Sequence, residues 1–172
     1  PVVLKNAEGD LTTPSVVFFE SQSEVTVGAA AKESAKMYPD QVVTFIKRSI
    51  GQPGFCLNLN GIDMKPEEIS SYILKKVVQD AEETMRMEGK LGNEEHIRNV
   101  VITCPAYFGV AEREATKTAG IITGLNVMAI INEPTAAAIT YGVTDDSQEK
   151  TVLVYDLGGG TFDITMIHIR PG

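Results

Sequence analysis

The alternation of strand-like and helix-like segments between Asn99 and Gly142 constrains the fold more than any other feature of the sequence. The apolar run RNVVITCPAYF precedes the helix-like VAEREATKTAGIITG, and the apolar run LNVMAII precedes NEPTAAAITYG. A strand–helix–strand order favours two parallel strands with the helix packed on them. Ligands bind such sheets beyond the carboxyl ends of the strands. Pro105 and Glu133 follow the two strands, so both are candidate site residues.

Further elements are expected on the N-terminal side of this unit. PSVVFFE and EVTVGAAA are typical of two strands joined by a polar turn, and a short helix is expected from Gly28 to Asp40, ending near Pro39. The clearest helix is KPEEISSYILKKVVQDAEETMRME, because Pro66 fits its first turn. Apolar side chains recur every four residues along it, which predicts one core-facing stripe. The stripe consists of Ile69, Ile73, Val77, Ala81 and Met85.

Three consecutive glycines separate the last two strand-like runs. TVLVYDL and TFDITMIHI flank Gly158–Gly160, which predicts a hairpin with the glycines in its turn. Glycine adopts positive φ without strain, and successive exposed N–H groups in such a turn bind anions such as phosphate. Asp156 enters the turn and Asp163 leaves it, so a cation is needed between these carboxylates and a phosphate. Mg²⁺, held partly through water, suits that position.

On pattern alone the glycine turn has two interpretations. Glycine-rich hairpin turns also occur without any ligand, so phosphate binding and an ordinary turn both remain open. The motif is not a dinucleotide fingerprint, because no helix follows the glycines. It also lacks the Gly-Lys-Ser/Thr ending of a P-loop.

Composition and charge exclude several classes of function. The 172 residues carry a formal net charge of -8, which disfavours nucleic acid as a partner because phosphate binding needs a basic patch. No apolar run approaches membrane-spanning length, so no membrane partner is expected. Cys56 and Cys104 lie far apart in apolar surroundings and are expected to be packed, reduced thiols of a cytoplasmic protein. His96 and His168 show no metal-ligand spacing.

The motifs YDLGGGTFD and IINEPTAAAITYG closely resemble those of the DnaK-type seventy-kilodalton heat-shock chaperones. VVITCPAYF, REATKTAG, TTPSVV and KRSIG match the same family in the same order, so the resemblance covers nearly the whole chain. It implies an α/β fold of the actin-like, ribonuclease-H-like ATPase kind. It also implies a chaperone cycle in which ATP hydrolysis is coupled to the binding and release of unfolded polypeptides.

The resemblance implies a catalytic role for two residues far apart in the sequence. Lys47, in FIKRSIG, matches a lysine that reaches the γ-phosphate and positions the attacking water. Glu133, in NEPTAAA, matches a carboxylate that helps to hold the metal's water shell or the attacking water. The alternatives are a solvated surface lysine and a helix-start acid that interacts with the helix dipole.

Other site residues follow from the same resemblance. Asp156 and Asp163 match metal-associated carboxylates. Pro105 and Arg113 match a proline switch and its arginine relay, which report the nucleotide state to the substrate domain; ordinary helix solvation is the alternative for Arg113. The second phosphate loop of the family matches Gly158, Gly159, Gly160 and Thr161, and Thr161 also counts among the catalytic residues.

The ligands and partners implied are those of the family. They are ATP and ADP with Mg²⁺ and K⁺, unfolded peptide clients, a J-domain co-chaperone and a nucleotide exchange factor. Many members use an arginine for co-chaperone contacts where this chain has Ala129, and Gly109 and Val110 replace a common Asn-Asp pair. The change at Ala129 bears on partner coupling and not on the nucleotide chemistry. Only QPGFCLNLNGIDM joins KRSIG to KPEEISS, where the family usually carries a much longer stretch.

The family match also predicts a division into lobes. Residues 1–150 are expected to form lobe I, with a smaller subdomain at about 13–64 and a core subdomain made of 1–12 and 65–150. Residues 151–172 are expected to begin lobe II with the second phosphate loop. The family's first phosphate loop and adenosine-binding subdomain have no counterpart in the sequence, so the 172 residues alone are expected to be inactive as an ATPase.

Two further expectations concern the chain as a whole. The alternative function is a non-catalytic fragment or relative of the actin-like superfamily that acts as a binding or scaffold module. NEPTAAA argues against an actin-like sugar kinase or filament protein. Half-built lobes expose sheet edges, which predicts some tendency to self-associate.

Overall fold

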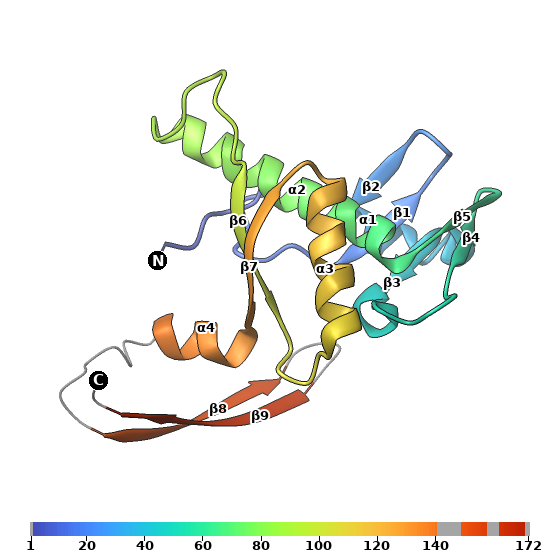
Figure 1. Cartoon of the computed structure of the whole chain (residues 1–172). Coiled ribbons are helices and arrows are strands. Elements are labelled where there is room, and N and C mark those ends of the chain that lie inside the picture. Colours follow the sequence, from blue (N-terminus) through green and yellow to red (C-terminus); the bar gives the residue numbers. More distant parts are fainter. Residues whose placement is uncertain (1, 141–148, 158–161, 171–172) are drawn as a thin grey trace.

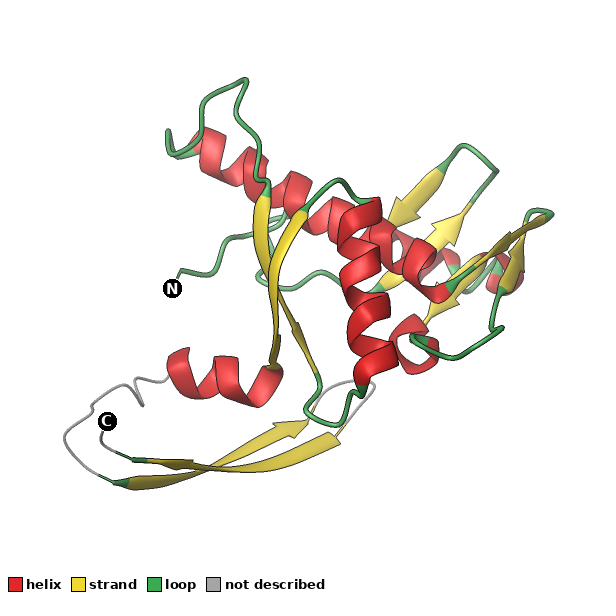
Figure 2. Cartoon of the chain, in the orientation of Figure 1, coloured by secondary structure: helices red, strands yellow, loops and turns green. Residues whose placement is uncertain are grey.

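The computed structural model describes residues 2–140, 149–157 and 162–170, and its elements are shown in Figures 1 and 2. The strands are β1 (Val16–Phe19), β2 (Val25–Val27), β3 (Val42–Thr44), β4 (Leu57–Leu59), β5 (Ile62–Met64), β6 (Asn99–Cys104), β7 (Asn126–Asn132), β8 (Lys150–Leu157) and β9 (Phe162–Ile169). The α-helices are α1 (Ala29–Ser34), α2 (Pro66–Met87), α3 (Val110–Ile122) and α4 (Glu133–Thr140). Two short 3₁₀ helices are η1 (Pro39–Gln41) and η2 (Ile46–Ser49). The elements are therefore both α and β, as the sequence predicts.

Strands β6 and β7 pair in parallel, as the strand–helix–strand order predicts. Helix α3 connects them and packs on both strands (Figure 1). Gly120 makes this close approach possible, because a Cβ added there would lie 2.4 Å from Cγ2 of Val127. The carboxyl ends of the two strands lie together, so Pro105 and Glu133 follow adjacent strand ends as predicted.

A three-stranded antiparallel sheet in the order β2-β1-β3 forms a second unit. On one face, Val17 and Phe19 of β1 pack against Ile69 of α2. On the other face, Ala31 of α1 covers Val16 and its neighbours. All four residues of β1 are buried because both faces of the sheet are covered. The hairpin β4–β5 extends the first of these two clusters.

Helix α2 has the predicted bounds, with Pro66 as its first residue, but its apolar stripe is only partly buried. Ile69 is fully buried, whereas the side chain of Val77 is 46% exposed, so the predicted stripe is wrong at that position. The sheet covers only the first turns of α2. Val77 instead borders a hollow of about 340 Å³ that it shares with Leu4 and Leu11 of the N-terminal segment.

The hairpin β8–β9 is antiparallel, as predicted, and Asp156 lies directly opposite Asp163. Helix α4 contacts β8, and Figure 1 shows the hairpin at the bottom of the view, below α4. Residues on the two faces alternate between half-buried and exposed. The exposed face carries Leu153, Tyr155, Leu157, Phe162, Ile164 and Met166.

Two local predictions are wrong. Helix α1 ends at Ser34 and does not continue to Pro39, because the N–H groups of Met37 and Tyr38 close a tight turn on the Ser34 carbonyl. The ring of Tyr38 then stacks on Phe18, which directs the chain back onto the sheet. Cys56 is exposed and not packed, because it lies on the open loop before β4, while Cys104 is buried; both thiols are free. The division of residues 1–150 into subdomains stays a prediction.

Candidate functional site

An ion pair joins the two residues for which the resemblance implies a catalytic role. Nζ of Lys47 donates to Oε1 of Glu133 at 2.7 Å, across 86 residues of sequence. The side chains are 45% and 22% exposed, respectively, so both remain open to solvent. A pair this exposed contributes about 0–1 kcal/mol to stability. The contribution of this ion pair to stability is therefore too small to explain why Lys47 and Glu133 lie together.

Lys47 is held in place by its apolar neighbours on η2. Ile46 packs into the cluster formed by the β1–β3 sheet and α2. Ile50, directly after η2, packs with Cys104 and Phe108 at the carboxyl end of β6. These two anchors fix η2 on both sides. The side chain of Lys47 between them then reaches the end of β7.

Glu133 is the first residue of α4 and follows β7 without a break. A carboxylate in the first helical turn interacts favourably with the helix dipole, which was the alternative interpretation of this residue. The ion pair with Lys47 exists in addition to that interaction. Pro134, the next residue, is fully buried and anchors the start of the helix.

Pro105 and Arg113, the predicted relay, belong to one hydrogen-bonded turn. Pro105 is fully buried, and its carbonyl accepts a hydrogen bond from the N–H of Phe108. The Phe108 carbonyl in turn accepts from Nε of Arg113 at 3.0 Å. Nη2 of Arg113 donates to Oδ1 of Asn132 at 2.6 Å. Since Asn132 directly precedes Glu133, this turn connects the end of β6 with the start of α4.

Asp156 and Asp163 face each other at the end of the β8–β9 hairpin. Like charges at directly opposed positions of an antiparallel pair repel each other. In the described part of the chain, neither carboxylate has an ion pair or a side-chain hydrogen bond. Gly158, Gly159, Gly160 and Thr161, the predicted phosphate loop, lie outside the described residues.

The two aspartates fit the donor set of a Mg²⁺ ion. This ion prefers carboxylate oxygens and keeps several of its waters, so one or two carboxylates suffice. Within residues 2–140, 149–157 and 162–170, no three His, Cys, Asp or Glu side chains are grouped so that they could hold a metal directly. Two carboxylates alone would leave most of the coordination sphere of such an ion to water.

The thiol of Cys104 is buried at the carboxyl end of β6, beside Ile50 and Phe108. Burial raises the pKa of this thiol, and the charges of Arg113, Glu133 and Lys47 also act on it. The charged groups of η2, α3 and α4 thus converge on the carboxyl end of β6. Burial keeps the thiol in its neutral form beside them.

Three residues of this arrangement were not predicted as functional from the sequence. They are Asn132, which binds Arg113, Cys104, which packs on Ile50, and Gly51, which follows η2. Asn132 is the last residue of β7 and directly precedes Glu133, so its position at the end of a parallel strand could have marked it as a candidate site residue. Nothing in the residue types indicates the contacts of Cys104 and Gly51, because these depend on how η2 packs on β6 and α3.

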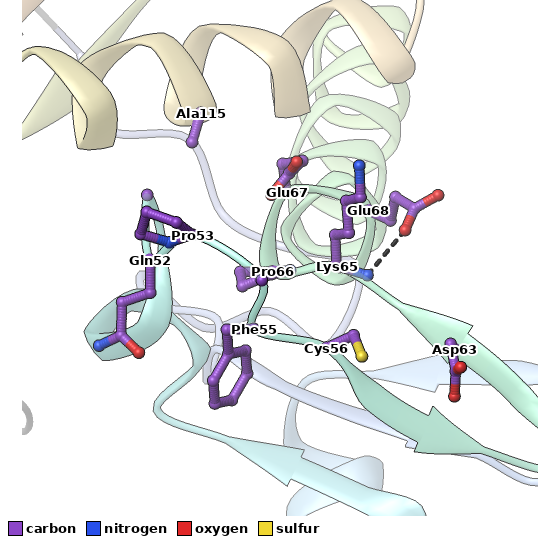
Figure 3. Close-up of a pocket in the computed structure, with 12 residues that line it drawn as sticks. Gln52, Pro53, Phe55, Cys56, Asp63, Lys65, Pro66, Glu67, Glu68 and Ala115 are labelled. Atoms are coloured by element: carbon purple, nitrogen blue, oxygen red, sulfur yellow. Dashed lines mark hydrogen bonds between the residues drawn. The ribbon is translucent and has the colours of Figure 1, made fainter.

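A hollow separate from the ion pair lies between the loop that follows η2, the start of α2, and α3 (Figure 3). Its volume is about 550 Å³. Figure 3 shows Phe55, Pro66 and Ala115 on its walls, together with the acidic side chains of Glu67 and Glu68. Neither Lys47 nor Glu133 lines it, so this hollow is separate from the ion pair.

Comparison with known proteins covers the entire chain. The model of the family described as "Hsp70 protein" matches residues 1–56 and 52–172. The two matched stretches overlap at residues 52–56, in the segment after Gly51.

Curated proteins named "Chaperone protein DnaK" are among the relatives that the chain matches. Those of Thermosipho melanesiensis, Thermotoga petrophila and Thermotoga maritima are each 48% identical over 170 residues. Each alignment covers 99% of this chain and 27% of the relative. The chain therefore spans about a quarter of the length of the curated relatives that it matches. No helix in the described ranges is long and apolar enough to cross a membrane.

Proposed function

Because the chain belongs to the Hsp70 protein family, we propose that it forms part of the ATP-binding and ATP-hydrolysing domain of a molecular chaperone. In this proposal, hydrolysis is coupled to the binding and release of unfolded polypeptides. The domain has the actin-like fold, and residues 151–172 start its second lobe. The free thiols of Cys56 and Cys104 fit a cytoplasmic location.

The observation that carries the proposal is the ion pair between Lys47 and Glu133. An ammonium and a carboxylate at the carboxyl ends of parallel strands lie where a ligand of such a sheet binds. Phosphoryl transfer needs a cation to spread charge from the γ-phosphate and a group to orient the attacking water. Lys47 supplies the cation. Glu133 accepts a hydrogen bond from the water or from the metal's water shell.

The second phosphate loop completes this part of the site. We assign phosphate binding to Gly158, Gly159, Gly160 and Thr161, and the metal to Asp156 and Asp163 through water. When bound, Mg²⁺ neutralises charge on the phosphates. The proposed role of the two aspartates is to orient the water shell of such an ion, and their opposed positions in the hairpin support this assignment. K⁺ is the second proposed ion.

The partners proposed are those of a DnaK-type chaperone. They are unfolded peptide clients, a J-domain co-chaperone and a nucleotide exchange factor. The turn that links Pro105 through Arg113 to Asn132 is the proposed relay between the nucleotide and these partners. Ala129 removes a cationic side chain at the position that many members use for the co-chaperone.

We expect the 172 residues on their own to be inactive. Catalysis in a two-lobed site depends on groups from both lobes being held together. The alternative function, a non-catalytic binding or scaffold module, shares the fold and differs in turnover. Measured turnover in the full-length protein therefore separates the two functions.

The test is Lys47→Ala in the full-length protein that carries this segment. Single-turnover ATP hydrolysis is expected to fall by about 100-fold or more, because a positioned charge acts mainly on the transition state. Nucleotide affinity, measured by calorimetry, is expected to stay close to that of the parent. The same assay on the 172-residue chain is expected to give no turnover.

Lys36→Ala is the matched control, because Lys36 also forms an ion pair, with Glu33, but is far more exposed. Hydrolysis in this variant should equal that of the parent. Hydrolysis at near-parental rate in Lys47→Ala would remove Lys47 from the mechanism. A full-length parent without turnover would favour the scaffold function.

A further inference from the structure

We propose that Ile50 and Gly51 are positioning residues that set the place of the Lys47 ammonium. The pair follows η2 directly and joins it to two other elements, β6 and α3. The inference deepens the proposed function, since it rests on the Lys47–Glu133 pair being the reacting part of the site. It concerns two residues to which no chemistry has been assigned.

Gly51 lies in close contact with the first turn of α3. A Cβ added to Gly51 would lie 2.7 Å from the backbone N, 2.8 Å from Cα and 2.9 Å from Cγ of Glu112. Backbone atoms inside a helix cannot move aside as a side chain end can. Gly51 also has φ +76°, which favours glycine for a second, independent reason. Only a residue without Cβ fits between η2 and α3.

Ile50 holds the same segment from the opposite direction. Its side chain is 6% exposed and packs on Cys104 and Phe108 at the end of β6. Lys47 lies three residues before Ile50, on the 3₁₀ turn that these contacts fix. A displacement at residues 50 and 51 therefore moves the ammonium relative to Glu133.

Both partners of the ion pair are thus placed by the first turn of α3. Glu112 in this turn packs against Gly51 and so fixes the position of the segment that carries Lys47. Arg113, the next residue, donates a hydrogen bond to Asn132 and so fixes the position of the chain just before Glu133. The distance of 2.7 Å between the two charges depends on this shared support. A movement of the proposed relay would change both ends of the pair together.

The space around the loop permits displacement without unfolding. Gly51 also borders the 550 Å³ hollow beside the start of α2. Because open space borders this loop, its backbone can adjust when a Cβ at residue 51 meets Glu112. Gly51→Ala is therefore expected to fold with η2 shifted.

The experiment uses carbodiimide cross-linking of the 172-residue chain, with mass spectrometry of the digested product. The carbodiimide activates the Glu133 carboxylate, and the deprotonated Lys47 amine displaces the urea to form an amide. This reaction requires contact between the two groups and no ATP. In the parent chain the Lys47–Glu133 cross-link is expected. In Gly51→Ala its yield should fall about tenfold or more, because reactions between positioned groups lose that much for a shift of about 1 Å.

Gly54→Ala is the matched control. Gly54 lies in the same loop with φ +72°, but a Cβ there would meet nothing within 4 Å. It carries the same backbone strain without the collision, so its cross-link yield should equal that of the parent. Circular dichroism on every variant establishes that it is folded.

If Gly51→Ala does not fold, Ile50→Val decides the question, because it removes one methyl group from the same support. A reduced yield in Ile50→Val supports the proposal, and an unchanged yield in either folded variant overturns it. The cross-linking result does not depend on whether Lys47→Ala loses ATP hydrolysis. The proposed function can therefore fail while the positioning role stands, and the reverse also holds.

Discussion

The two cysteines have the same chemistry in opposite surroundings. Cys56 is exposed on a loop, whereas Cys104 is 1% exposed at the end of β6, where burial raises the pKa of its thiol. Sequence spacing predicted that both would be free but could not separate them. Apolar neighbours in sequence do not pack unless another element covers them, and none of the described elements covers the side chain of Cys56.

The environment of Cys104 predicts a dependence of stability on pH. Its raised pKa in the folded chain means that the unfolded chain loses this proton first as pH rises. The contribution of this group is complete below the unfolded pKa of about 8.5 and is lost as pH rises through the folded value. Urea unfolding at pH 7 and at pH 9.5 should show a larger loss of unfolding free energy in the parent than in Cys104→Val. Equal losses in the two chains would show that Cys104 does not titrate differently on folding.

The site residues show what motifs can and cannot predict. The resemblance assigned Lys47 and Glu133 by their local motifs, and the structure brings them to 2.7 Å. Their contact depends on the left-handed backbone of Phe45, the packing of Ile50 and the turn at Gly51. None of these is visible as a pattern, because a 3₁₀ turn of four residues has no hydrophobic period.

At the scale of elements, long periodic segments were the predictable ones. Helices α2 and α3 and the strands β6 and β7 follow from apolar spacing and from the order of segments. The short strands β4 and β5, of three residues each, were not predicted within QPGFCLNLNGIDM. Their pairing depends on the turn at Asn60 and Gly61, both at positive φ, and on packing against α2.

The close packing of α3 on β6 and β7 predicts that a glycine-to-alanine substitution in this helix lowers stability, where such a substitution in an open helix raises it. Gly120→Ala in an open helix would stabilise by about 1 kcal/mol. Here a Cβ would lie 2.4 Å from Cγ2 of Val127 and 3.1 Å from Cδ1 of Ile102. Overpacking of this kind costs about 1–3 kcal/mol, so the free energy of unfolding in urea should decrease.

Lys117→Ala on the same helix serves as the comparison, since Lys117 is exposed and its change should leave stability within about 0.5 kcal/mol. A Gly120→Ala chain as stable as the parent, or more stable, would show that α3 does not pack this closely. Such a result would mean that α3 lies farther from β6 and β7 in solution.

The whole molecule exposes more surface than its mass requires. Its accessible surface is 10830 Å² at 18.6 kDa, whereas a compact monomer of this mass exposes about 8,200 Å². Permanent interfaces bury about 1,000–2,500 Å² on each partner, so the excess of about 2,600 Å² is as large as one partner's share of a large interface. Exposed apolar side chains line the outer face of β8–β9, where the half-exposed or exposed rings of Tyr155 and Phe162 meet edge to face with centroids 4.8 Å apart.

An exposed apolar face with open strand edges on both sides should bind another copy when the chain is alone in solution. The outer face carries every second residue from Leu153 to Leu157 and from Phe162 to Met166, and none of these is charged. Asp156 and Asp163 lie on the opposite, half-buried face. Two outer faces can therefore pack together without burying a charge. Sedimentation of the 172-residue chain should therefore show dimers or larger species as concentration increases. Leu157→Lys with Ile164→Lys should shift this equilibrium toward monomer, because both side chains are exposed and a buried lysine at an interface is costly. A strict monomer at high concentration would show that the outer face of the hairpin does not drive association.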